Sequence, residues 1–146
     1  MKPRRLVKFL RLPAAEKGLL IEAAVLLPAA RAVIQWVPIR WYAPLLLGRH
    51  LAELPRGEVA ADEARLRRVA WAARVVSDVM PWRNKCFALA MTVKWMLARR
   101  GVASVLYLGA RTLENRGFRA HAWLRCGDLY LTGGDGGGVG KVSSFV

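Results

Sequence analysis

Residues 82–101, WRNKCFALAMTVKWMLARRG, decide the fold because they predict an apolar helix that begins beside a cysteine. Asn84 is a good N-cap residue for this helix, and Gly101 is well placed to end it. The cysteine lies on an apolar face of the predicted helix, made of Cys86, Leu89, Ala90, Val93 and Leu97. A helix with such a face needs a second layer of structure to cover it.

That second layer is predicted by the sequence that follows, where the hydrophobic pattern changes from helical to extended. Residues 102–110 are rich in β-branched and apolar residues and predict a strand. Residues 120–126 and 129–132 flank Gly127 and Asp128, a short turn that suits a hairpin. The sequence therefore predicts an α+β fold, with N-terminal apolar helices followed by the cysteine-bearing helix packed on a small antiparallel sheet.

The residues before the quoted stretch predict further helices. Residues 14–36 form an apolar segment with Pro13 acceptable in its first turn, and Pro28 is expected to kink or divide the helix. Turn formers gather shortly before residue 60. We therefore expect an N-terminal helical region, residues 1–60, that docks a partner, and a core over residues 61–146.

The predicted core opens with a clear amphipathic helix, which begins at Asp62 and is stopped by Pro81. Its basic residues lie off the apolar face. Because that face has helical spacing, we expect it to be buried: Leu66, Val69, Ala70, Ala73 and Val76.

The charge balance indicates the kind of partner. The chain has 24 Lys and Arg against 10 Asp and Glu, a formal net charge of +14 that is spread along the sequence. Such a charge attracts nucleic acid, anionic lipid or an acidic peptide and does not choose between them. Since no recognised nucleic-acid motif is present, we do not expect a nucleic-acid partner, and a basic binding module is the lesser alternative.

The apolar run from Leu19 to Ala30 raises the question of a targeting segment. Glu22 interrupts the run and Pro28 lies inside it, so neither a membrane span nor a signal peptide is expected. Peripheral membrane contact remains compatible with basic residues beside apolar helices.

The two cysteines, Cys86 and Cys126, form neither a CxxC motif nor a disulfide framework. With only His50 and His121 beside them, zinc-ligand spacing is absent. We therefore expect no metal, no cofactor and a reducing, cytoplasmic compartment.

Cys86 is the candidate nucleophile. In the first turn of a helix, unsatisfied backbone N–H groups and the helix dipole favour a negative charge, and Arg83 and Lys85 add positive charge nearby. Both effects favour the thiolate, which is the attacking species, and the same N–H groups can hold an oxyanion. The alternative is that Cys86 is a small core hydrophobe.

His121 is the candidate base. Strand alternation puts His121, Trp123 and Arg125 on one face, and Ala120, Ala122, Leu124 and Cys126 on the other. A strand-borne histidine near a helix-borne cysteine can take the thiol proton and later protonate a leaving amine. The alternative is a packed histidine. Cys126 has the wrong alternation to join this face and is interpreted as structural, and His50 as a surface residue.

A third group is expected to orient the imidazole. Asp128 belongs to the tight turn and is expected to point away from His121. Asp135 lies just beyond the last predicted strand, within the glycine-rich residues 133–140, which predict a mobile loop or disordered end. Asp135 is therefore the candidate, and a solvated loop aspartate is the alternative.

Taken as a set, several stretches resemble the B2-type leader peptidases of lasso peptide biosynthesis, whose core belongs to the transglutaminase-like superfamily. The likeness covers nearly the whole chain. The matching stretches are RLVKFLRLP (5–13), WRNKCFALA (82–90), LARRGV (97–102), YLGAR (107–111) and FRAHAWL (118–124).

The resemblance implies a cysteine peptidase that cleaves a ribosomally made precursor peptide between its leader and core segments. It implies a small, separate B1-type protein that recognises the leader, and the apolar N-terminal helices are candidates for docking it. A lasso cyclase that uses ATP is implied as a further partner, because it consumes the freed amine.

The chain departs from the family at one position. The family often places an aspartate directly after the second hairpin strand, where this chain has Gly133, so the third member of the site is in doubt. The runner-up activity is acyl transfer, in which an amine in place of water resolves the same thioester.

Overall fold

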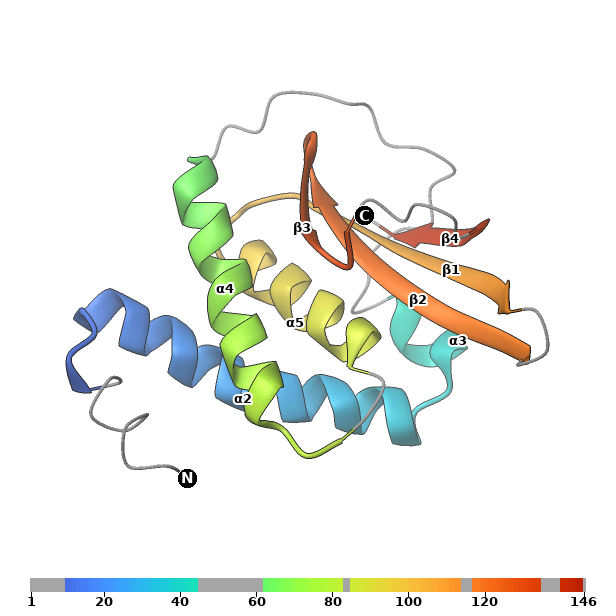
Figure 1. Ribbon diagram of the computed structural model, residues 1–146, viewed down its shortest axis with the longest axis horizontal. Coiled ribbons are helices and arrows are strands. Elements are labelled where there is room, and N and C mark those ends of the chain that lie inside the picture. The colour runs from blue at the N-terminus through green and yellow to red at the C-terminus, as the bar shows by residue number, and fades with distance from the viewer. Residues whose placement is uncertain (1–9, 45–61, 83–84, 114–116, 135–139, 146) are drawn as a thin grey trace.

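The computed structural model describes residues 10–44, 62–82, 85–113, 117–134 and 140–145. Helices α2, α3, α4 and α5 precede an antiparallel sheet, so the predicted α+β fold is confirmed (Figure 1). The helices are α2 (Ala14–Trp36), α3 (Ile39–Tyr42), α4 (Glu63–Val79) and α5 (Cys86–Ala98), and the strands are β1 (Val105–Leu113), β2 (Gly117–Cys126), β3 (Leu129–Thr132) and β4 (Gly140–Phe145).

The strands lie in the order β3-β2-β1-β4, and each neighbouring pair is antiparallel. The predicted hairpin of β2 and β3 is confirmed, with Gly127 at positive φ in its turn. The sequence interpretation missed β4, because it ended the regular structure at a glycine-rich loop. Residues 140–145 instead pair with β1 along one edge of the sheet.

Helix α5 begins at Cys86 and ends in the way the sequence predicts. The N–H of Val102 donates to the carbonyl oxygen of Leu97 at 3.0 Å, and the N–H of Gly101 donates to that of Ala98 at 3.0 Å. Gly101 has a φ of 70°, and together these features make a Schellman motif. Because the N–H of Val102 takes part in this motif, β1 starts at Val105 and not at residue 102 as predicted.

The start of α5 differs slightly from the prediction. Lys85 takes the N-cap position without a capping side chain, and Asn84, the predicted N-cap, lies outside the described residues. The helix itself begins at Cys86.

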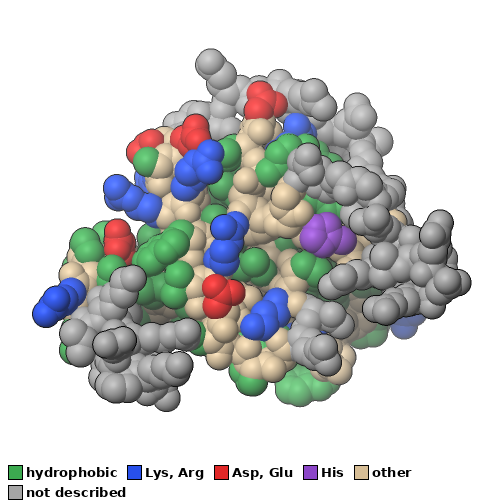
Figure 2. Space-filling view, viewed as in Figure 1, with side chains coloured by type: hydrophobic (Ala, Val, Ile, Leu, Met, Phe, Trp, Pro, Cys, Tyr) green, Lys and Arg blue, Asp and Glu red, His purple; other side chains and the backbone are tan. Residues whose placement is uncertain are grey.

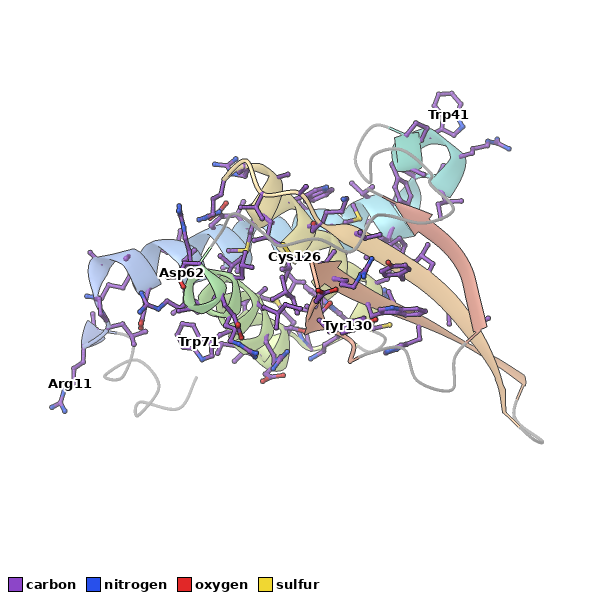
Figure 3. All side chains as sticks on the ribbon, turned by 90° about the horizontal axis from the view of Figure 1, so that it is seen from above. Arg11, Trp41, Asp62, Trp71, Cys126 and Tyr130 are labelled. Carbon is purple, nitrogen blue, oxygen red and sulfur yellow. The ribbon has the colours of Figure 1, made fainter. Side chains whose placement is uncertain are left out.

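One apolar core joins α2, α4, α5 and a single face of the sheet. Cys126 lies within it, between the helices and the sheet (Figure 3). The predicted apolar face of α4 is confirmed as buried. The core residues of α2 and the sheet are Leu20, Ala23, Leu27, Ala30, Leu106, Ala122, Leu124, Cys126 and Leu131.

Helix α2 is continuous through Pro28, so of the two effects expected of this proline, a kink or a division of the helix, the division does not occur. Glu22, which interrupts the apolar run, binds both Arg100 at 2.6 Å and Arg99 at 3.0 Å. These ion pairs connect α2 to the end of α5. By length and hydropathy alone α2 could cross a membrane, a test that buried core helices and signal sequences also pass.

Polar contacts hold the sheet against the helices. The ammonium group of Lys94, buried in α5, donates to the carbonyl oxygen of Ser104 at 2.7 Å, just before β1. Burial lowers the pKa of Lys94 to about 8. Arg74 of α4 donates to the carbonyl oxygen of Leu131 in β3 at 3.1 Å. The ends of β1 and β3 are thereby fixed relative to α5 and α4.

Candidate active site

Cys86 stands at the first position of α5 and is partly exposed. The following residue, Phe87, packs near Tyr42 of α3, with ring centroids 6.5 Å apart. The ammonium group of Lys85 donates to the carbonyl oxygen of Ser77 at 2.6 Å, in the last turn of α4. The positive charge of Lys85 thus interacts favourably with the C-terminal end of the α4 dipole. Lys85 also directly precedes Cys86 in the sequence. Arg83 lies outside the described residues.

His121 lies in β2, paired with Gly109 of β1. It shares a face with Trp123, and their rings stack with centroids 5.9 Å apart and an interplanar angle of 23°. Ala122, Leu124 and Cys126 point instead into the core shared with α5. The alternation predicted for this strand is therefore confirmed.

The row of side chains on this face continues onto β1. Tyr107 stacks on Trp123 with centroids 5.5 Å apart, and the guanidinium carbon of Arg125 lies 5.7 Å from the Tyr107 ring centroid. The sequence interpretation named Trp123 and Arg125 but missed Tyr107. Tyr107 lies two residues before Gly109, which pairs with His121. Strand alternation therefore places Tyr107 on the same face as His121, and the sequence could have shown this.

The imidazole of His121 has a defined hydrogen-bond partner. Its Nε2 lies 2.8 Å from the main-chain carbonyl oxygen of Gly133. A carbonyl oxygen can only accept, so Nε2 must carry the proton. In the neutral ring Nδ1 then carries the lone pair, and Nδ1 is the atom able to accept a proton.

Gly133 follows the last residue of β3 and has a φ of 75°. A Cβ atom at this position would overlap the carbonyl oxygen of Ala122 and lie 2.7 Å from Cβ of Trp123. Only glycine fits here without a shift of the backbone. The sequence interpretation treated Gly133 as the loss of a functional group. Asp135, its candidate for that role, lies outside the described residues, as does His50.

Cys86 and His121 come from elements that lie against each other. Helix α5 contacts β2 and points its N-terminal end toward the Gly117 end of that strand (Figure 1). Histidine reaches the surface in Figure 2, consistent with partial exposure of His121. In the described part of the chain no hydrogen bond joins Sγ of Cys86 to the imidazole, and His121 has the opposite alternation to the strand residues that pack on α5.

The second thiol has a different environment. Cys126 is fully buried, and its Sγ donates to the carbonyl oxygen of Ala103 at 3.2 Å. Burial raises the pKa of the Cys126 thiol, because the thiolate would lose its hydration. Cys126 is therefore a structural residue, as its strand alternation predicts. Asp128 is exposed in the turn between β2 and β3.

A cysteine at the start of a helix that packs on an antiparallel sheet, with a histidine on the second strand, defines a transglutaminase-like core. The transglutaminase-like superfamily matches residues 24–145, and the chain belongs to that superfamily. The match begins within α2 and extends to the end of β4. Neither the curated proteins nor the solved structures contain a significant match to this chain.

The two thiols are expected to differ sharply toward an alkylating reagent. Iodoacetamide should modify Cys86 in the folded protein and Cys126 only after unfolding, because Cys126 is buried and hydrogen-bonded. Peptide mass spectrometry at successive times measures both reactions. Modification of Cys126 at the rate of Cys86 under native conditions would contradict the assignment.

Proposed function

We propose that this protein is a cysteine peptidase that removes the leader from a ribosomally made lasso precursor peptide. The observation that supports it best is the hydrogen bond from Nε2 of His121 to Gly133, which leaves Nδ1 free to act as a base. The likeness of the cysteine and histidine stretches to the leader peptidases supplies the substrate class. Both cysteines are free thiols, which suits the cytoplasmic location that we propose.

The proposed reaction starts with proton transfer from Sγ of Cys86 to Nδ1 of His121. The thiolate attacks the carbonyl carbon of the scissile peptide bond, and backbone N–H groups in the first turn of α5 stabilise the oxyanion. The imidazolium then returns the proton to the leaving amine as the C–N bond breaks. Water, deprotonated by the same imidazole, hydrolyses the thioester and frees the leader carboxylate.

The proposal requires the sulfur and the imidazole to approach when the substrate is bound. Since His121 lies on the face of the sheet opposite to the one that packs on α5, this approach requires a rearrangement of the site and not merely the tightening of a long hydrogen bond. Cys86 is suited to this, because it stands at an end of α5 and is not buried under the sheet. The freed amine of the core peptide then passes to a separate cyclase.

Acyl transfer is the second candidate, since the superfamily contains both cysteine hydrolases and transferases. It uses the same thioester and differs only in the nucleophile that resolves it. The products distinguish the two: hydrolysis gives a free leader acid, and transfer gives a leader amide.

Leader cleavage is expected to depend on both site residues. With the precursor peptide and its leader-recognition protein, Cys86→Ala should give no product, and His121→Ala should lose about 10²- to 10⁴-fold in rate through loss of the general base. Mass spectrometry of the products measures both. Cys126→Ala is the matched control for removal of a thiol, and its cleavage rate should stay close to that of the wild type.

Circular dichroism of each variant separates loss of chemistry from loss of folding. Full cleavage by a folded His121→Ala variant would contradict the role of His121. Full cleavage by Cys86→Ala would contradict the entire proposal.

We further propose that the leader-recognition protein docks on the outer face of α2. The described part of the chain leaves apolar side chains uncovered there, with Ile21 58% and Val25 64% exposed. Trp36, the last residue of α2, is 80% exposed, and Trp41 of α3 is 66% exposed and points away from the body of the protein (Figure 3). Exposed tryptophans beside aliphatic residues are typical anchors of a protein interface.

Docking is tested by placing a charge on this face. Val25→Lys should weaken binding of the recognition protein by about tenfold or more, the cost of one buried anchor, while alkylation of Cys86 is unchanged. Val75→Lys, which alters an exposed valine of α4, is the matched control. Calorimetry measures the affinity. Unchanged affinity in Val25→Lys, with loss of binding to anionic lipid vesicles, would instead assign the face to a membrane surface.

A further inference from the structure

We infer that the main-chain carbonyl of Gly133, and not a carboxylate, is the group that orients the imidazole of His121. The inference rests on the proposed function for its catalytic meaning, but its geometry stands independently. Nε2 of His121 and the carbonyl oxygen of Gly133 are 2.8 Å apart, a good hydrogen-bond distance. The acceptor fixes the Nε2–H tautomer and leaves Nδ1 unprotonated in the neutral ring.

The path of the chain explains why a carbonyl takes this place. Strands β2 and β3 pair Leu124 with Thr132. If that register continued, residue 135 would lie opposite His121, as expected for an orienting aspartate. The strand ends at Thr132 instead, and Gly133 and Gly134 follow with φ of 75° and 70°. These left-handed residues take the chain out of the extended conformation before residue 135.

Close packing holds the Gly133 carbonyl in position. A Cβ atom at Gly133 would meet the carbonyl oxygen of Ala122 and Cβ of Trp123. Trp123 also stacks on the His121 ring. The backbone of Gly133 therefore lies against the residue that supports the imidazole, so the ring is restrained through one face by Trp123 and through one edge by the carbonyl.

A neutral acceptor has a different effect from a carboxylate. The carbonyl selects the same tautomer and ring orientation, which are the contributions that a positioning group makes. It places no net negative charge beside the imidazolium. Gly133 is thus a positioning residue that acts through its backbone carbonyl. Glycine is required at this position because no side chain fits there.

The tautomer can be observed directly in the full-length protein. In a sample labelled with ¹⁵N-histidine, the His50→Gln variant leaves one imidazole to assign, because the chain has two histidines. Nitrogen–proton correlation at a pH where the ring is neutral should show a proton on Nε2 and none on Nδ1. A proton on Nδ1, or the averaged tautomers of a free imidazole, would overturn the inference.

The chain offers a matched pair of substitutions. Gly133→Ala and Gly134→Ala both place a Cβ at positive φ, but within the described part of the chain only the first meets other atoms, since no described atom lies within 4 Å of a Cβ at Gly134. Gly133→Ala should lose the Nε2–H signature and about 10- to 100-fold in cleavage rate, the usual effect of losing an orienting partner. Gly134→Ala should keep the signature and most of the rate.

If the Gly133→Ala variant does not fold, the test uses instead a protein in which the peptide bond between residues 133 and 134 is an ester. Ligation at Cys126 introduces this ester into the full chain, where it weakens the Gly133 acceptor without adding atoms. It should lower kcat with little change in KM. An unchanged kcat and tautomer would overturn the inference, and so would an equal loss of rate in Asp135→Asn. An inactive wild type that keeps the Nε2–H signature would defeat the proposed function and leave the tautomer assignment standing.

Discussion

The burial of α5 determines how the other helices and the sheet are arranged. Nearly every residue of this helix from Ala88 to Leu97 is buried, and even Lys94 is enclosed, with its ammonium group on the carbonyl of Ser104. Because the helix has almost no polar face, α2, α4 and the sheet must cover it from several sides. Its first turn lies at the edge of that enclosure, and Cys86 is there. The burial of the rest of α5 is therefore compatible with an accessible thiol at Cys86.

Much of this arrangement could be predicted because it depends on local patterns. The Gly101 cap, the hairpin turn at Gly127 and the alternation that separates His121 from Ala122 follow from backbone geometry and burial. Other features depend on contacts that a local pattern does not contain. Pro28 does not divide α2 because the helix is held on both sides of it by the core and by the ion pairs of Glu22. Strand β4 forms because the edge of β1 is available to pair with it.

In the site, too, local patterns predicted some features and not others. The alternation of β2 predicted the face of His121, but no side-chain pattern could predict that its hydrogen-bond partner is a main-chain carbonyl. A glycine in place of an aspartate looks like a lost function when only side chains are compared. In the structure, the positive φ of Gly133 and its fit against Ala122 and Trp123 bring a backbone oxygen to Nε2. Asp135 stays a prediction, because it lies outside the described residues.

The proposed reaction requires His121, held by Gly133, to act as the base for the thiol of Cys86. A crystal structure of the protein with a peptide aldehyde joined covalently to Cys86 tests it most directly. We expect Nδ1 of His121 within hydrogen-bond reach of the hemithioacetal formed at Cys86, with Nε2 still on the Gly133 carbonyl. An imidazole that remains on the opposite face of the sheet from the inhibitor, with another group beside the sulfur, would contradict it.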